Sequence, residues 1–162
     1  MKKISYQLIL LIFLINIVAC SGYKPIFSSS NLDFKIEDYS ILGDKKLGNQ
    51  IYSKLYNLSR LSENTQETKN IYIQINASQN KQATAKNSAG KVLGYKINLT
   101  TTITINDFIT EKEILTDTFS FSSAYKIKDQ FSETIKLEKQ IIENLTEKTY
   151  QDLLIRFSEN IL

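Results

Sequence analysis

Residue types that carry out most enzyme chemistry are scarce in this sequence of 162 residues. Histidine is absent and cysteine occurs once, which removes the imidazole general base and the commonest metal ligand. The sequence contains no GxSxG, GxxxxGK[ST], HExxH or CxxC motif. Serine and threonine are numerous, but no histidine is present to activate them as nucleophiles. We therefore expect no enzyme activity, no cofactor and no metal site.

Two acidic pairs are the remaining candidates for acid–base chemistry. Glu37 and Asp38 are adjacent in a candidate strand, where alternation points them to opposite faces and makes them a poor catalytic pair. Glu111 and Glu113 share a face at the start of another strand. The favoured interpretation of this second pair is a solvated turn.

Three lysines and no acidic residue occur in the connection Ser78–Lys91, with the sequence SQNKQATAKNSAGK. The lysines are Lys81, Lys86 and Lys91. A basic loop tip between two strands can meet the phosphates of a lipid headgroup, because each lysine acts as a mobile point charge. The alternative is an ordinary soluble hairpin in a lysine-rich protein.

Cys20 follows a segment with the composition of an export signal. Lys2 and Lys3 form a positive start, and the apolar run Leu8–Val18 is too short for a permanent membrane span. The stretch Ile17-Val18-Ala19-Cys20 resembles the bacterial lipobox, in which the cysteine thiol receives diacylglycerol and the chain is cut before it. The alternative is a chance cysteine beside a simple N-terminal anchor helix.

This resemblance divides the chain into residues 1–19 as a lipoprotein signal peptide, 20–33 as a lipidated tether and 34–162 as a single domain. Acyl chains on Cys20 would hold the protein on a membrane surface. Ser21 follows the cysteine, where aspartate would favour the inner membrane, so the resemblance implies the periplasmic side of the outer membrane. Loss of Lys2 and Lys3 leaves 18 basic and 17 acidic residues, a nearly neutral chain for which we expect no nucleic-acid partner.

The first part of the domain predicts a strand followed by a helix. Residues 34–42 alternate well enough for a strand that ends at Gly43. Asp44 is placed to cap a helix through Leu61, whose apolar residues recur at intervals of three and four and form one stripe. Residues 62–70 are polar and predict a loop.

Three strands and a long helix follow. Residues 71–77, 95–105 and 113–124 alternate between apolar and polar side chains, with Asp117 as an exception on its apolar face. Residues 128–160 return to a helical period and contain no glycine or proline. The helical stripe is expected to comprise Phe131, Ile135, Ile142, Leu145, Leu153 and Phe157.

These elements predict an α+β fold in the order β-α-β-β-β-α, a two-layer sandwich with two helices packed on one face of a four-stranded, largely antiparallel sheet. The other face is rich in threonine, asparagine and tyrosine, including Tyr72, rather than in charge. Such a face suits docking on a partner. The alternative is the β-propensity of threonine in a merely exposed sheet.

Three short segments together resemble the LptE-type lipoproteins of lipopolysaccharide assembly. The segment 20–27 (CSGYKPIF) is similar to their mature start, apart from the insertion of Ser21. Residues 91–97 (KVLGYKI) resemble the family's polar segment that leads into a tyrosine-containing strand. Residues 119–125 (FSFSSAY) resemble the strand that precedes its last helix.

The resemblance implies a non-enzymatic protein that plugs and helps assemble the β-barrel LptD and assists lipopolysaccharide transport to the cell surface. It implies contact with lipopolysaccharide through basic residues near a strand connection, here Lys86 and Lys91. It also implies attachment to outer-membrane lipid through acylated Cys20. An accessory, pilotin-like lipoprotein of another envelope assembly or secretion machine remains the alternative.

Overall fold

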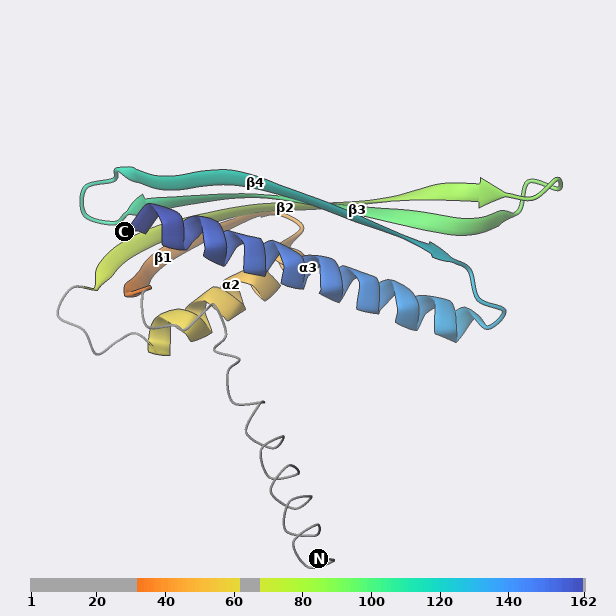
Figure 1. Ribbon diagram of the computed structural model, residues 1–162, viewed down its shortest axis with the longest axis horizontal. Coiled ribbons are helices and arrows are strands. Elements are labelled where there is room, and N and C mark those ends of the chain that lie inside the picture. Colours follow the sequence, from red (N-terminus) through yellow and green to blue (C-terminus); the bar gives the residue numbers. More distant parts are fainter. Residues whose placement is uncertain (1–31, 62–67, 162) are drawn as a thin grey trace, which may run out of the picture.

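The computed structural model describes residues 32–61 and 68–161, which form one sheet and two helices (Figure 1). The elements follow the chain as β1 (Phe34–Gly43), α2 (Lys45–Leu61), β2 (Lys69–Lys86), β3 (Val92–Asp107), β4 (Glu113–Lys126) and α3 (Phe131–Ile161). Both helices lie on the same side of the sheet. The predicted order and the two-layer α+β fold are confirmed. The expected signal segment and Cys20 lie outside the described residues.

The sheet is mixed and its spatial order, β1-β2-β3-β4, follows the chain. β1 pairs with β2 in parallel, and the other two pairs are antiparallel. The parallel pair requires a crossover, and α2 supplies it on one side of the sheet. Gly43 ends β1 with a positive φ of 70°, and the next amide, of Asp44, donates to the Ala77 carbonyl at 2.7 Å.

Both helix starts are fixed by side-chain oxygens. Asp44 Oδ1 accepts from the backbone amides of Lys46 and Leu47 at 3.0 and 3.2 Å, which satisfies two donors that the first turn of α2 leaves unpaired. Before α3, the Thr134 hydroxyl accepts from the Lys128 amide at 2.9 Å and so ties the preceding segment to the helix. The expected capping role of Asp44 is confirmed.

The core lies between the helices and the covered face of the sheet. The buried side chains come from alternate positions of β2, β3 and β4 and from one stripe of each helix. Phe34 and Phe157 meet edge to face with ring centroids 5.0 Å apart and join the first strand to the last helix. The uncovered face, which we call the open face, consists of the intervening polar positions.

The two helices cover the sheet unequally. α3 runs along most of the sheet, with the tip of the β2–β3 hairpin projecting beyond it, whereas α2 covers only the half that contains β1 (Figure 1). The first two residues of the expected α3 stripe are exposed, Phe131 by 79% and Ile135 by 50%. The stripe is therefore not buried over the first turns of α3, because these turns lie beyond the part of the sheet that α2 also covers.

The connection Ser78–Lys91 is shorter than predicted. β2 continues to Lys86 and β3 begins at Val92, so only residues 87–91 form a turn. All side chains from Ser78 to Lys91 are exposed, and the pairing of this part of β2 rests on the backbone bonds with β3. Lys81 and Lys86 therefore belong to a strand, and only Lys91 belongs to the connection.

Two irregular positions differ from simple alternation. A bulge in β1 lies between Ile36 and Asp38 and makes Glu37 an extra residue, so the alternation that separated Glu37 from Asp38 is interrupted. Asp117 lies in an unbroken register with β3 and stays on the helix-facing side. There its carboxylate lies 3.5 Å from Nε of Arg156 on α3, which explains an acid at a position that otherwise predicts an apolar residue.

Candidate functional site

Two of the residues expected to bind phosphate, Lys86 and Lys91, flank the turn between β2 and β3. Asn87 builds this turn, because its Oδ1 accepts from the amides of Ala89 and Lys91 at 3.1 and 2.9 Å. Gly90 adopts a φ of 81° in the turn. Both lysines are exposed, and among the described residues neither forms an ion pair. The turn thus holds two free cations close together.

A groove of about 630 Å³ lies beside this turn, where β4 ends against the start of β3. Its walls include two exposed apolar side chains, Leu93 and Ile127, and the ammonium-bearing Lys126. The amide of Ile127 donates to the carbonyl of Leu93 at 3.0 Å and holds the two apolar residues together. Apolar walls beside lysines suit an amphiphile with an anionic group. We call the turn and this groove the basic tip.

The third lysine of the predicted set, Lys81, is used internally. Its ammonium lies 2.5 Å from Oε2 of Glu138 on α3 and 4.4 Å from the centre of the Tyr95 ring. The Tyr125 hydroxyl donates to the same Glu138 oxygen at 2.6 Å. These four residues, which we call the Lys81 cluster, join three strands to the long helix. Lys81 is therefore not available to a phosphate in this arrangement.

Burial and bonding act in opposite directions on the Lys81 cluster. Partial burial by itself would lower the pKa of Lys81, but its bonds to Glu138 and Tyr125 outweigh burial, and the pKa is raised. Burial would raise the pKa of Glu138, but the bonds from Lys81 and Tyr125 prevail and the pKa is lowered. Burial, followed by the Glu138 bond, raises the pKa of Tyr125. The ion pair is favoured at neutral pH.

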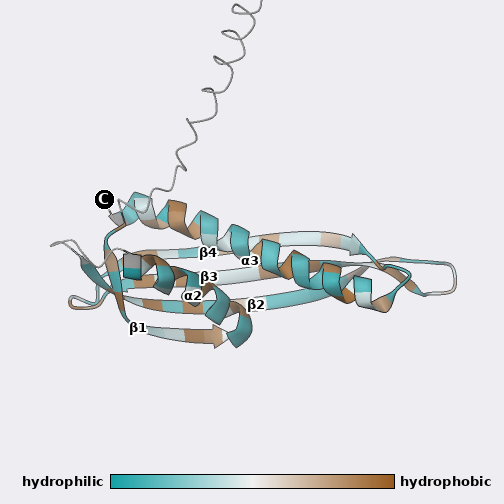
Figure 2. Cartoon of the chain, turned by 90° about the horizontal axis from the view of Figure 1, so that it is seen from below, coloured by the Kyte–Doolittle hydropathy of each residue, from teal (hydrophilic) through white to brown (hydrophobic). Residues whose placement is uncertain are grey.

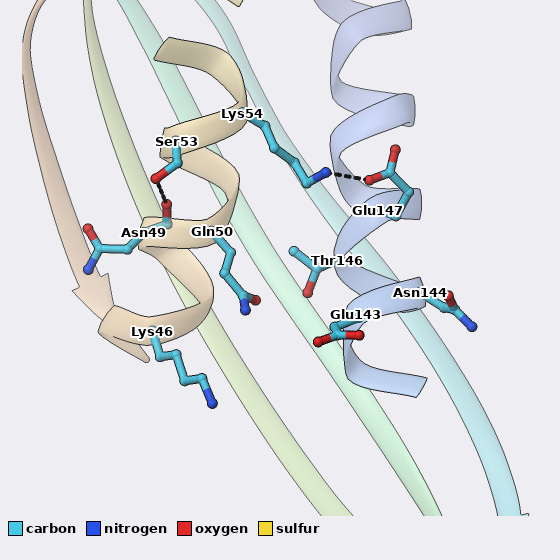
Figure 3. A pocket seen from close by; sticks show the side chains of 9 residues that line it. All are labelled: Lys46, Asn49, Gln50, Ser53, Lys54, Glu143, Asn144, Thr146 and Glu147. Atoms are coloured by element: carbon cyan, nitrogen blue, oxygen red, sulfur yellow. Dashed lines mark hydrogen bonds and ion pairs between the residues drawn. The ribbon is translucent and has the colours of Figure 1, made fainter. Parts of the chain in front are cut away.

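A second groove, of about 750 Å³, separates α2 from α3 (Figure 3). One wall carries the basic and amide residues of α2, and the other carries acidic and amide residues of α3. Lys54 crosses the groove and bonds Glu147 at 2.6 Å. Oε1 of Gln50 is buried and has no hydrogen-bond partner among the described residues. The groove is lined by polar side chains, and two of its four charged residues, Lys54 and Glu147, already neutralise each other.

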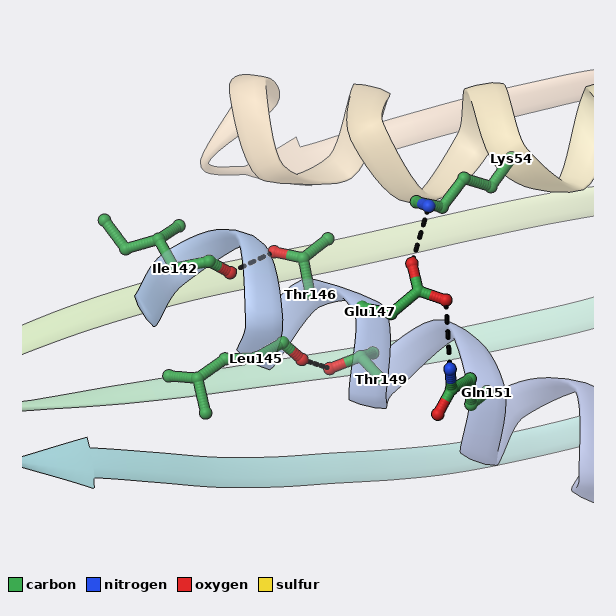
Figure 4. Close-up of polar contacts among 7 residues, drawn as sticks. All are labelled: Lys54, Ile142, Leu145, Thr146, Glu147, Thr149 and Gln151. Carbon is green, nitrogen blue, oxygen red and sulfur yellow. Dashed lines mark hydrogen bonds and ion pairs between the residues drawn. The ribbon is translucent and has the colours of Figure 1, made fainter. Parts of the chain in front are cut away.

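Hydroxyl groups along α3 are occupied within the helix (Figure 4). Thr146 donates to the Ile142 carbonyl at 2.8 Å, and Thr149 donates to the Leu145 carbonyl at 3.0 Å. Both threonines are buried. Such bonds satisfy a buried hydroxyl without involving another element. These threonines are part of the packing and are not placed as nucleophiles.

The open face is a sheet of uncharged polar side chains over its central part. Neighbouring hydroxyls bond across β3 and β4 in three successive pairs: Thr100 with Ser120 at 3.3 Å, Thr102 with Thr118 at 2.9 Å, and Thr116 with Thr104 at 3.1 Å. Tyr72, which sequence analysis singled out, donates to Ser40 of β1 at 2.8 Å. The hydroxyl groups of this face are therefore already bonded to one another.

Neither acidic pair forms a catalytic arrangement. Glu37 bonds Lys35 at 2.8 Å. Glu111 has a positive φ of 58° in the turn between β3 and β4, and Glu113 begins β4; both are exposed. The same turn is organised by Asp107, whose pKa is lowered chiefly by the backbone amide and hydroxyl of Thr110. The solvated-turn interpretation of this segment agrees with the structure.

The part of the chain that the structure describes holds neither a metal-binding cluster nor a helix suited to cross a bilayer. No three His, Cys, Asp or Glu side chains in residues 32–61 and 68–161 gather closely enough to hold a metal ion. No helix in that part of the chain combines the length and the apolar character that a bilayer span requires.

Lys126 and the apolar pair Leu93 and Ile127 of the basic tip were not predicted from the sequence. Lys126 is separated from Lys86 by most of two strands, and only the pairing of Gly94 with Lys126 brings the end of β4 to the turn. The register could not be read from the alternation, because alternation assigns faces and not neighbours. The single available signal was the pair of lysines at 126 and 128 after the last strand.

Comparison of the structure with solved proteins identifies a shared fold. The rare lipoprotein B from Shewanella oneidensis matches with a TM-score of 0.52 and 13% identity, over 76% of this chain and 96% of that chain. The minor lipoprotein from Acinetobacter baumannii matches with a TM-score of 0.53 and 17% identity, over 77% and 92%. Lipoprotein B from Nitrosomonas europaea matches with a TM-score of 0.52 and 14% identity, over 82% and 88%.

At these identities the likeness concerns the fold, and the chain is an α+β protein with the two-layer architecture of these solved lipoproteins. No protein-family model matches the sequence, and no curated protein matches it.

Proposed function

We propose that this chain is an outer-membrane lipoprotein of the LptE type, anchored on the periplasmic side, which plugs and helps assemble an LptD-type β-barrel and assists lipopolysaccharide transport. Residues 1–19 are the signal peptide, 20–33 the lipidated tether and 34–162 the domain. The observation that carries the proposal is the coincidence of a lipobox-like Cys20 with a fold shared by solved lipoproteins.

The open face supports a plugging role. The wall of a β-barrel lumen is built from strands whose inward side chains are polar. An uncharged, hydroxyl-rich sheet can lie against such a wall without burying unpaired charge, which would be costly. The bonded pairs of threonine and serine leave no strong charge over the centre of this face.

The basic tip supports contact with lipopolysaccharide. Lys86 and Lys91 offer ammonium groups to phosphates, and Lys126 lies in the apolar groove beside them. The groove walls Leu93 and Ile127 suit acyl or other apolar parts of the same molecule. The chain's role is to bind and position, and no step of bond cleavage is assigned to it.

Purification of the partner is the decisive experiment. The full-length, tagged protein is isolated from detergent-solubilised outer membranes, and its stoichiometric partners are identified. We expect one large β-barrel at a one-to-one ratio, together with a mature N-terminus at acylated Cys20. Recovery alone, or with a secretion or pilus subunit, would contradict the plug proposal and favour the pilotin-like alternative. Replacement of Cys20 by serine should abolish acylation and membrane recovery.

Lipopolysaccharide binding is tested separately at the basic tip. The double variant Lys86→Ala and Lys91→Ala should weaken binding by up to about thirtyfold, because each exposed ammonium–phosphate contact contributes up to about 1 kcal/mol. A charge-matched control replaces Lys45 and Lys112, which are exposed and lie away from the tip. Equal binding by the two double variants would remove Lys86 and Lys91 from the site.

A further inference from the structure

β2 has an edge that no described strand covers. β1 runs beside β2 only as far as the pair Gly43 and Ala77, and the chain then turns into α2. β2 continues beyond this point from Ser78 to Lys86 (Figure 2). On its other side this stretch pairs with β3, so it is a firm strand rather than a loop. The sheet therefore has an empty strand position in line with β1.

Backbone groups on this edge point outward at alternate residues. The Ala77 carbonyl faces the β1 side, since it accepts from the Asp44 amide at 2.7 Å. Alternation places the amides and carbonyls of Gln79, Lys81 and Ala83 on the same side, before the irregularity between Ala83 and Ala85. Unpaired groups of this kind form a template for an added strand.

A groove of about 420 Å³ lies directly under the empty position. Leu47 of α2 and Ile135 and Ile142 of α3 supply its apolar lining, beside Gln79 of β2. The rest of the lining is polar and carries both signs of charge: Asp44, Lys46, Gln50, Glu138, Lys139 and Glu143. Ile135 is half exposed although it belongs to the apolar stripe of its helix. A strand laid along β2 would place alternate side chains into this groove, where apolar ones would cover Ile135.

Charge at the edge selects the occupant. The segment Ser78–Lys91 contains no acid, and two of its three lysines, Lys86 and Lys91, form no ion pair among the described residues, whereas Glu138 neutralises Lys81. Lys96 of β3 adds a charge on the open face opposite Gln82. A second copy of this edge would bring lysines against lysines, so self-pairing is disfavoured. A segment of another protein that carries acidic residues on the open face would instead be attracted by these lysines.

We propose that the edge of β2 from Gln79 to Ala83 binds an extended segment of another protein by strand addition. Alternate residues of that segment are apolar and enter the groove over Ile135. The intervening residues are acidic and lie on the open face. Backbone hydrogen bonds supply the attraction, and the groove and the lysines supply the selection. The proposal does not depend on the identity of the barrel partner.

The test uses the full-length protein and a synthetic eight-residue peptide in which valine alternates with glutamate, with both ends blocked. Amide hydrogen exchange is followed by NMR at single residues. In the free protein, Gln79, Lys81 and Ala83 should exchange quickly, whereas Ser78, Asn80 and Gln82 are protected by β3. The peptide should protect the first set and leave the second unchanged. A peptide with lysine in place of glutamate serves as the charge control.

Proline variants separate strand addition from side-chain contact. Gln79→Pro removes an outward amide without breaking a bond to β3, and it should weaken peptide binding about tenfold, because a donor is lost and the ring obstructs the edge. Gln79→Ala keeps the amide and should bind within about twofold of the wild type, as the side chain makes no backbone bond. Circular dichroism confirms that both variants are folded.

Three results would overturn the proposal. The first is an unchanged exchange rate at Gln79, Lys81 and Ala83 when the peptide is saturating. The second is equal binding of the glutamate and lysine peptides, or of the proline and alanine variants. The third is a dimer, detected by sedimentation in the absence of peptide, in which the amides of Gln79, Lys81 and Ala83 are already protected from exchange. None of these results bears on partner purification from outer membranes, so this proposal and the plug proposal can fail independently.

Discussion

The Lys81 cluster is expected to stabilise the half of the sheet that α2 does not cover, and Glu138→Gln tests this. One oxygen of Glu138 accepts from the Lys81 ammonium at 2.5 Å and from the Tyr125 hydroxyl at 2.6 Å. The residues come from α3, β2 and β4. Glutamine has the same shape and keeps an oxygen for Tyr125, so the substitution removes the charge and little else.

The expected loss in the free energy of unfolding depends on how exposed Lys81 and Glu138 are. A hydrogen bond to a charged group contributes about 1.5–3 kcal/mol, whereas an exposed ion pair contributes about 0–1 kcal/mol. The Glu138 side chain is 19% exposed and the Lys81 side chain is 34% exposed, so the pair is neither fully buried nor fully exposed. Its contribution should therefore lie between the two energies. We expect Glu138→Gln to lower the free energy of unfolding by about 1–2 kcal/mol at pH 7.

The pH dependence gives a sharper test than the magnitude. Glu138 has a lowered pKa in the folded protein, so its contribution is present above the unfolded pKa of about 4.3 and is lost as the pH falls through the folded value. Lys81 has a raised pKa, so its contribution is present below the unfolded value of about 10.4 and is lost at higher pH. The difference between wild type and variant should be constant near neutrality and shrink on acidification.

Urea unfolding followed by far-UV circular dichroism, at pH 7 and in steps toward pH 3, measures this difference. Glu113→Gln is the control, since Glu113 is exposed at the start of β4 and forms no ion pair among the described residues. A loss that is equal at all pH values would show that the charge is not responsible. A loss no larger than that of the control would refute a stabilising role for the cluster.

Three further substitutions probe the packing, each measured by urea or thermal unfolding. Phe157→Ala should cost about 3–5 kcal/mol, because the ring is fully buried in the core, and a cost below about 1 kcal/mol would contradict its placement. Gly43→Ala should destabilise clearly more than Gly90→Ala, since both have positive φ but only at Gly43 would the added Cβ collide with a backbone atom, the Ala77 oxygen. Thr101→Val should stabilise by up to about 1 kcal/mol, because the buried hydroxyl has no partner among the described residues; a marked loss would reveal one.

Side-chain periodicity accounts for the parts of the fold that were predicted correctly. Leu47, Ile51 and Leu55 recur at four-residue intervals on α2, and all three are buried. Ile71, Ile73 and Ile75 alternate and are buried on β2. In α2, and in β2 as far as Ala77, one face contacts the core without interruption, so the pattern in the sequence is complete there.

The extension of β2 could not be predicted by the same reasoning. From Ser78 to Lys86 every side chain is exposed, so no alternation is required and none is present. The stretch is a strand because its backbone pairs with β3, residue against residue up to Ala83. β-structure that is held by backbone bonds alone leaves no hydrophobic pattern in the sequence.

The Lys81 cluster could not be predicted from the sequence either. Lys81 and Glu138 are 57 residues apart, and the contact depends on the register of three strands and on the rotation of α3 about its axis. The sequence identified Lys81 as a basic residue in a segment free of acids, which is correct, but the neutralising acid comes from another element. Charge counted along the chain therefore overestimated the number of free lysines in the segment.

Stability and binding capacity are divided between the two halves of the sheet. Where β1, α2 and the end of α3 lie together, the largest buried side chains pack and no strand edge of β2 is free. Beyond Gly43 the sheet continues without β1 and α2, and the bare edge of β2, the half-exposed Ile135 and the basic tip all lie there. A large core in the first half, and a smaller cluster around Ile97, Leu99 and Tyr125 in the second, allow the second half to keep unpaired backbone and exposed apolar groups without unfolding. Ligands and partners should therefore engage the half beyond Gly43, and substitutions there should change binding more than they change stability.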